Sequence, residues 1–302
     1  MALTRRAFLC RSFGAFGAAA LAFERFGLLR ALAQTGDFKA LVCIFLFGGN
    51  DSGNMIVPYD DYAAYASVRE ESGLALPQSS LLPIDVPGIG RRFALHPSLT
   101  GLHELWGGGK MAVVCNVGPL VEPTTRDSYR NGAVRLPLNL FSHSDQQNQW
   151  QTSVADGNSS AGWGGRTADN TAGLNSGNFP AMVSVAGTPI FVTGNSERPL
   201  AIAPAPTRLD AALRLDGFPN PPDGSLRYLT MQSVLQMDQD FALVRGASRV
   251  TSEALEVQRT LSLVGDPAAP PFPLTPSTNL GNQLEQVAKL ISLRASLGMS
   301  GQ

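Results

Sequence analysis

The residues best suited to chemistry lie in two short polar stretches, and the first is Gly48–Asn54 (GGNDSGN). Asp51 follows the apolar run Leu41–Phe47 by four residues, and its Asn and Ser neighbours supply further oxygen atoms. In open parallel sheets, ligands bind beyond the carboxyl ends of the strands. Such oxygens suit a metal ion or, with backbone amides, an oxyanion. The alternative is an Asx-rich turn that only caps the backbone. A P-loop is disfavoured because the Gly-Lys-Ser/Thr ending is absent.

The second stretch reads Ser142-His143-Ser144-Asp145-Gln146 and begins a sequence of good helix formers. Hydroxyl groups at a helix start gain from the positive end of the helix dipole, which favours anionic character there. His143 between the two serines is suited to act as a base, a ligand or a hydrogen-bond donor. The alternative is a Ser/Asp N-cap beside an exposed histidine.

Two apolar runs are expected to position these stretches. Leu41–Phe47 and Met111–Val117 are continuous apolar segments, which is typical of strands covered on both faces of a parallel sheet. A helix expected around Leu99–Trp106 lies between them in sequence, so the order predicts a βαβ crossover and an α/β fold. Because Ser142 follows the second run, both polar stretches are expected at one edge of the sheet.

The remaining segments predict further helices and short strands. Phe141–Ser153 is expected to be a helix, with Ser and Asp near its N-cap. A helical region is expected over Leu226–Val264 with a weak point at Gly246, and Asn279–Leu297 carries an apolar stripe at helical spacing. Strands are expected around Met182–Val185 and Ile190–Thr193. Trp163, flanked by glycines, is expected in a tight loop.

Composition and charge exclude several functional classes. The 302 residues are 44% hydrophobic and 16% charged with a net charge of −1, so there is no basic surface for nucleic acid. The apolar run Phe13–Phe23 is shorter than the roughly 20 residues that span a bilayer, so no stable membrane span is predicted. Cys43 and Cys115 lie in apolar runs, so we expect buried free thiols rather than a disulfide.

The first 33 residues have the organisation of an export signal. Thr4-Arg5-Arg6-Ala7-Phe8-Leu9 resembles the twin-arginine motif, the apolar run follows it, and Ala31-Leu32-Ala33 has the form of a cleavage site. The chain is therefore divided into a signal peptide, 1–33, and one α/β domain, 34–302. A periplasmic or secreted location is expected.

The chain resembles an exported family called domain of unknown function 1501, in the alkaline phosphatase/sulfatase-like superfamily. The resemblance spans nearly all of the expected mature chain. Besides the signal, it rests on FLFGGNDSGNMIVPY (45–59), FALHPSL (93–99), FSHSDQQNQWQT (141–152), GWGGR (162–166) and LGNQLEQVAKLI (280–291). It implies an alkaline-phosphatase-like sandwich with a mostly parallel central sheet.

The resemblance also implies a metal-dependent site for phosphate or sulfate esters. Asp51 would bind a divalent ion (Zn²⁺, Mg²⁺, Mn²⁺ or Ca²⁺), and Ser142 or Ser144 would be the nucleophile with His143 between them. In this sequence His143 or Asp145 is the candidate for a further ligand. The substrate would be a small anionic ester. The sequence departs from the pattern because no histidine follows His143 and the further Asp and His ligands are missing. We therefore expect an incomplete domain whose C-terminal part is absent.

Three functional interpretations are compatible with these motifs. The first is a metal-dependent ester hydrolase, and the second is a non-catalytic exported protein that binds a partner on the same fold. The third is a Gly-Asp-Ser-Leu type esterase, because Gly48-Gly49-Asn50-Asp51 matches its Gly-x-Asn-Asp block. The third is disfavoured because the upstream nucleophile and the C-terminal Asp-x-x-His are both missing.

The export prediction can be tested by replacing Arg5 and Arg6 together with lysine. The twin-arginine route requires both arginines, so the double variant should stay in the cytoplasm uncleaved, whereas the natural sequence is cleaved after Ala33. Cell fractionation measures the outcome. An unchanged amount of mature protein outside the cytoplasm would show that this interpretation of the N-terminus is wrong.

Overall fold

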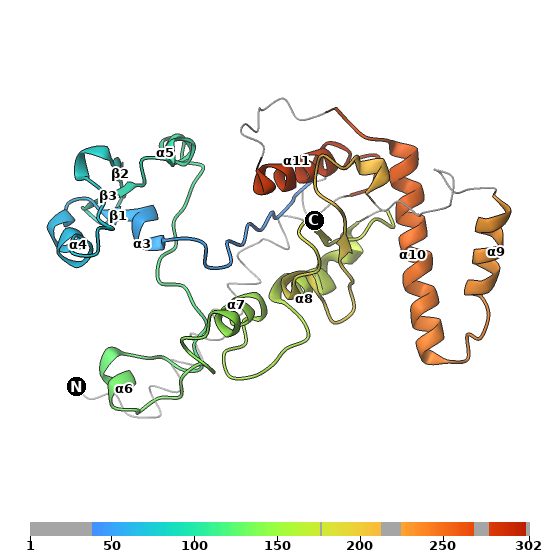
Figure 1. Cartoon of the computed structure of the whole chain (residues 1–302), viewed down its shortest axis with the longest axis horizontal. Helices are drawn as coiled ribbons and strands as arrows, with labels where there is room; N and C mark the ends of the chain where they lie inside the picture. The colour runs from blue at the N-terminus through green and yellow to red at the C-terminus, as the bar shows by residue number, and fades with distance from the viewer. Residues whose placement is uncertain (1–37, 176, 213–224, 269–277, 300–302) are drawn as a thin grey trace. The chain divides into compact units, whose positions relative to one another are not determined.

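A computed structural model describes residues 38–175, 177–212, 225–268 and 278–299 of the chain (Figure 1). It is a mixed helix-and-sheet structure, as the sequence predicts at this coarse level. Two compact units divide it. The 43–150 unit comprises Cys43–Trp150, and the 151–299 unit comprises the described residues from Gln151 onward together with 38–42. The predicted signal peptide, 1–33, lies outside the described residues.

A three-stranded antiparallel sheet forms the centre of the 43–150 unit. Its order is β1-β3-β2, with Val57 opposite Ala94 in the β1–β3 pair. Helix α4 packs on it, and Val57, Tyr65, Leu81 and Ala94 form a small buried cluster. The bounds in chain order are α3 (Ser52–Met55), β1 (Ile56–Pro58), α4 (Tyr62–Arg69), η1 (Gln78–Ser80), β2 (Leu82–Asp85) and β3 (Arg92–Leu95).

Three more helices follow the sheet in sequence. Helix α5 (Thr100–Gly107) and helix α7 (His143–Thr152) confirm two sequence predictions, and α6 (Arg126–Arg130) lies between them in the chain. Helix α6 begins with a capping box, in which the Thr125 and Ser128 side chains each accept a backbone hydrogen bond from the other residue.

The 151–299 unit is built mainly from helices around one apolar cluster. Leu209, Leu261 and Leu290 lie at its centre. The bounds are α8 (Trp163–Thr171), η2 (Ala172–Leu174), β4 (Val183–Ser184), η3 (Ile190–Val192), β5 (Leu200–Ala201), η4 (Leu209–Ala211), α9 (Leu226–Leu235), α10 (Ala242–Val264) and α11 (Asn279–Ser292). Strands β4 and β5 form a two-stranded parallel pair. Helices α9 and α10 lie side by side (Figure 1).

A buried ion pair joins helix α11 to this cluster. The Lys289 ammonium lies 3.4 Å from an Asp266 carboxylate oxygen and 3.4 Å from a Glu285 oxygen, and its side chain is 7% exposed. The Asp266 carboxylate also accepts a hydrogen bond from the backbone N–H of Leu209 at 2.7 Å. The charge of Lys289 is thus balanced by two carboxylates inside the unit, as a buried charge requires.

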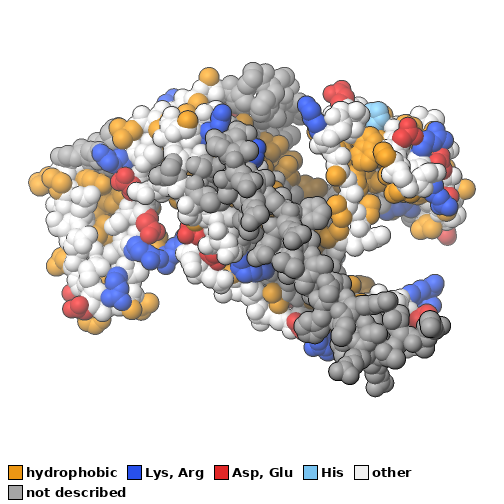
Figure 2. All heavy atoms as spheres, turned by 180° about the vertical axis from the view of Figure 1, so that it is seen from behind, with side chains coloured by type: hydrophobic (Ala, Val, Ile, Leu, Met, Phe, Trp, Pro, Cys, Tyr) orange, Lys and Arg blue, Asp and Glu red, His pale blue; other side chains and the backbone are white. Residues whose placement is uncertain are grey.

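The prediction of strands at 41–47 and 111–117 is wrong for this structure. Both segments are irregular, and most of their apolar side chains are exposed to solvent, with Leu41 at 61% and Val114 at 78%. A strand forms only when a neighbour takes up its backbone hydrogen bonds. In the described residues neither run has such a neighbour, and the predicted parallel central sheet is not formed there. Exposed hydrophobic side chains are visible at the surface in Figure 2.

Three smaller expectations also differ from the structure. Trp163 begins helix α8 instead of lying in a tight loop. Ile190–Val192 is a 3₁₀ turn and not a strand. The expected helical region 226–264 is broken, but the break lies at residues 236–241, where Asp238 has a positive φ of 52°, and Gly246 is inside α10. A left-handed residue cannot continue a right-handed helix, so the break follows Asp238 and not the glycine.

None of the helices in the described residues has both the length and the apolar content needed to cross a bilayer.

The two cysteines expected to be buried are exposed free thiols instead. Cys43 and Cys115 both lie in the irregular apolar runs, which no other element covers in the described part of the chain. Partial shielding by nearby atoms desolvates the Cys43 thiolate and raises the pKa of that thiol.

Thiol titration tests this correction. In a Cys10→Ser background, the folded chain should react with two equivalents of a thiol reagent without denaturant, and Cys43→Ser or Cys115→Ser should each remove one. Cys43 should react faster as the pH rises, since the thiolate is the reacting form and its pKa is raised. Fewer than two reactive thiols in the folded chain would contradict the exposure of these residues.

Candidate functional site

The carboxylate expected to bind a metal, Asp51, is held by an arginine. Arg69, the last residue of α4, donates two hydrogen bonds of 2.7 Å to the two Asp51 carboxylate oxygens. These bonds lower the pKa of Asp51, and the same bonds raise the pKa of Arg69. Such a bidentate pair has fixed geometry as well as charge attraction. It ties the Gly48–Asn54 stretch to helix α4.

Neighbouring polar atoms complete this arrangement. The Asn54 side-chain oxygen accepts hydrogen bonds from the Tyr65 hydroxyl at 2.7 Å and from Arg69 at 3.1 Å, and its amide nitrogen donates to the Leu74 carbonyl at 2.9 Å. The Tyr65 hydroxyl accepts from the backbone N–H of Leu76 at 2.9 Å. A Cβ on Gly53 would lie 2.4 Å from an Arg69 guanidinium nitrogen, so the pair needs glycine there.

The second stretch forms the start of helix α7. Ser142 precedes the helix, and its hydroxyl lies 3.4 Å from the backbone nitrogen of Asp145, which is the position of an N-cap. The Ser142 and Ser144 hydroxyl oxygens are 3.2 Å apart. The side chain of His143 is exposed, and that of Asp145 is partly buried. Within the described residues, His143 makes no hydrogen bond to either serine, so neither serine has a base in contact.

One hydrogen bond joins helix α7 to the residue just before the first stretch. The Gln147 side-chain amide, one turn into α7 from His143, donates to the Phe47 carbonyl at 2.7 Å. Phe47 and Gly48 have positive φ angles of 50° and 85°, so the chain turns sharply where the first run ends. The hydrogen bond therefore places the end of the first run, Phe47, next to helix α7, whereas the predicted proximity of Asp51 to Ser142 and Asp145 stays a prediction.

The side chains present do not fit a divalent metal ion. Both Asp51 oxygens are occupied by Arg69, and Asp51 and Asp145 belong to separate arrangements. No group of three or more His, Cys, Asp or Glu side chains placed to hold a metal ion is found in the described residues. Asp51 is thus engaged by Arg69 and Asp145 lies in the first turn of helix α7, and the predicted pair of metal ligands stays a prediction.

Sequence reasoning missed Arg69 and Tyr65, which determine the state of Asp51. Arg69 lies 18 residues after Asp51 and closes a hydrogen bond only because β1 and α4 fold back on the loop. No spacing rule marks such a pair. The one sequence signal is a basic residue at the end of a short Tyr/Ala-rich helix, where arginine also suits the helix dipole.

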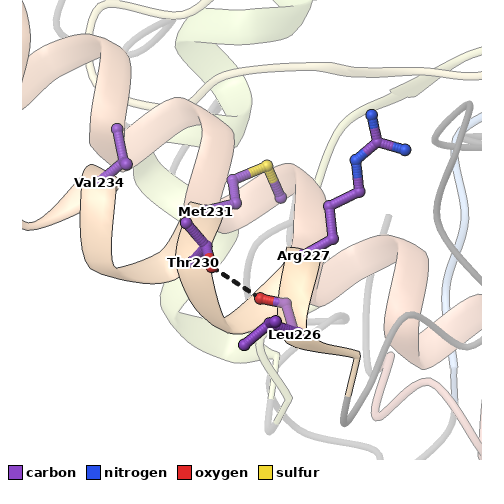
Figure 3. A pocket seen from close by; sticks show the side chains of 5 residues that line it. All are labelled: Leu226, Arg227, Thr230, Met231 and Val234. Atoms are coloured by element: carbon purple, nitrogen blue, oxygen red, sulfur yellow. Dashed lines mark hydrogen bonds between the residues drawn. The ribbon is translucent and has the colours of Figure 1, made fainter.

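An apolar pocket of about 640 Å³ lies elsewhere, on helix α9 (Figure 3). Its lining side chains all come from this one helix, and the Thr230 hydroxyl donates to the Leu226 carbonyl at 2.8 Å. Arg227 is the one charged residue of the lining, and none of the predicted site residues takes part. The lining residues are Leu226, Arg227, Thr230, Met231 and Val234. The pocket therefore offers apolar contact but no acid, base or nucleophile pair.

No family model matches the chain, and comparisons with curated proteins and with solved structures found no match.

Proposed function

We propose that the chain is an exported, non-catalytic binding protein that accepts an apolar β-strand of another polypeptide along the runs 43–47 and 111–117. The single observation that carries the proposal is the state of these runs. In the described part of the chain, no backbone N–H or C=O of residues 43–45 or 111–117 makes a hydrogen bond. The side chains beside them are apolar and exposed.

The chemistry of the runs defines the partner. Ile44, Leu46 and Phe47 are 52%, 45% and 50% exposed, and Val114 and Val117 are 78% and 52% exposed. Four of the five residues 43–47 are thus exposed, and only Phe45 is partly buried. Burial of apolar surface contributes roughly 25 cal/mol per Å². An extended apolar segment would supply both that burial and the missing backbone partners, as in strand addition.

The expected alkaline-phosphatase-like sandwich is part of the same proposal. Its inner strands are apolar on both faces, and the two runs have this composition. A strand from a partner would act as the neighbour that each run lacks in the described residues. Export through the twin-arginine route would place this binding outside the cytoplasm, and the protein would act there without ester chemistry.

A labelled strand peptide tests the binding proposal. The probe is LVCIFLF flanked by lysines, and the control probe has proline at its central position, because proline removes a backbone donor. Fluorescence anisotropy should show saturable binding of the first probe only. Leu46→Lys and Val114→Lys should weaken it by about tenfold or more, equal to 1.4 kcal/mol. Val68→Lys, a matched change at a 78% exposed site on α4, should leave it unchanged.

Two results of this assay would contradict the proposal. No saturable binding, or equal loss in Val68→Lys, would overturn strand addition. Sedimentation of the chain alone adds a further outcome. Self-association that Leu46→Lys abolishes would replace the separate partner by a second copy of this chain.

Ester hydrolysis is a second candidate, favoured by the Gln147–Phe47 hydrogen bond. That bond holds helix α7, which begins beside the Ser142 and Ser144 hydroxyls, against the end of the first run. A serine at a helix N-terminus is suited to bind or attack an anionic ester. His143, however, is not in contact with either hydroxyl in the described residues, and Asp51 is engaged by Arg69.

Assays separate the two candidates. The chain should show no turnover of 4-nitrophenyl phosphate or 4-nitrophenyl sulfate above background with Zn²⁺, Mg²⁺, Mn²⁺ or Ca²⁺ added. Asp51→Ala, Ser142→Ala and Ser144→Ala should therefore change nothing. Turnover that disappears in any of these three variants would overturn the non-catalytic proposal and assign that residue to an active site.

A further inference from the structure

We propose that Arg69 is the resident cation of the Gly48–Asn54 loop, and that its guanidinium stands where a divalent ion would bind Asp51. The inference concerns this loop alone and is independent of strand binding by the apolar runs. It makes Asp51 a positioning residue that fixes the loop on helix α4.

The oxygen atoms around the guanidinium are those that a hard cation would take. Two Asp51 carboxylate oxygens lie 2.7 Å from Arg69 nitrogens, and the Asn54 amide oxygen lies 3.1 Å from one of them. Carboxylate and amide oxygens are the common protein ligands of Ca²⁺ and Mg²⁺. Here they surround a guanidinium, whose planar fork matches a carboxylate in two parallel bonds. A divalent ion would have to displace that fork before it could reach Asp51.

The Arg69 side chain is held in place from several sides. It is 22% exposed, its guanidinium carbon lies 5.9 Å from the centroid of the Tyr65 ring, and it belongs to the last turn of α4. Gly53 leaves open the space that one guanidinium nitrogen occupies, since a Cβ there would approach it to 2.4 Å. The pair is therefore built into the loop and is more than a contact between two mobile surface chains.

Neighbouring carboxylates are paired in the same way. Asp60 accepts from Arg92, and Asp61 accepts from Arg91. Each of the three aspartates on the α3–α4 side of the sheet therefore has its own arginine. A metal at this loop would have only Asp51 and Asn54 to bind, and only after Arg69 had moved.

Mn²⁺ titration tests the proposal, with the electron paramagnetic resonance signal of free Mn²⁺ as the readout. The natural chain should show no saturable site at this loop. Arg69→Ala should free the Asp51 and Asn54 oxygens and raise Mn²⁺ binding at least about tenfold above the background of the natural chain, and adding Asp51→Asn should remove that gain. Arg91→Ala, which frees Asp61 at an exposed pair, is the matched control and should not create that site.

Arg69→Lys gives a second variant that keeps a positive charge without the fork. Its ammonium should still neutralise Asp51, so Mn²⁺ should not bind, and far-ultraviolet circular dichroism checks that each variant is folded. Two results would overturn the proposal. One is a saturable Mn²⁺ or Zn²⁺ site in the natural chain that Asp51→Asn abolishes. The other is a folded Arg69→Ala variant that binds no Mn²⁺, since Arg69 would then not be what excludes the ion.

Discussion

The bidentate pair between Arg69 and Asp51 determines how the first polar stretch is used. It joins the loop before β1 to the helix after β1, and the Asn54 and Tyr65 hydrogen bonds extend it to residues 74–76. The pair lowers the pKa of Asp51, so its stabilising contribution is complete above the unfolded value near 4. That contribution is lost only as the pH falls through the lower folded value. At neutral pH the Asp51 carboxylate is therefore paired with Arg69, and this pair holds the Gly48–Asn54 loop on helix α4.

A second constraint acts on the two apolar runs. A strand needs a row of backbone partners, and the described residues supply none to 43–45 or 111–117, while most apolar side chains of the two runs are exposed. Their composition suits an inner strand, yet their surroundings are those of a loop. The left-handed backbone at Phe47 and at Asn116, with φ of 50° and 57°, bends each run where a paired strand would continue straight. Residues with the composition of a core are thus exposed to solvent in the described structure.

Local signals predicted three helices. The cap of 141–153 and the apolar period of 279–297 depend on neighbours three or four residues away, and α5, α7 and α11 lie within the predicted bounds or one residue beyond them. Non-local features were not predicted. The predicted strands required partners distant in sequence, and Arg69 reaches Asp51 only through the folded sheet. The exposure of Cys43 and Cys115 and the pairing of Asp51 with Arg69 both depend on contacts between residues distant in sequence.

The glycines at 164 and 165 account for a further wrong prediction, the loop expected around Trp163. Glycine inside a helix is unfavourable by itself, so their sequence suggested a loop. In the structure a Cβ on Gly165 would lie 2.1 Å from the Thr193 backbone, and one on Gly164 would meet the Phe191 ring at 2.6 Å. These glycines let helix α8 lie directly on the 190–194 segment, where Trp163 packs edge-on against Phe191 with centroids 4.7 Å apart. Close packing against residues 190–194 therefore accounts for helix α8, although glycine has a low helix propensity.

The Gln147–Phe47 hydrogen bond has a consequence for the order in which the 43–150 unit assembles. Its ends are 100 residues apart, and closing a flexible loop of that length costs about 4 kcal/mol in chain entropy. A hydrogen bond contributes roughly 1 kcal/mol. By this comparison the bond alone does not offset the closure of the loop, so we expect it to form after the β1–β3 sheet has shortened the intervening chain. We therefore expect it among the last contacts made and the first released, with helix α7 parting from Phe47 while the sheet stays folded.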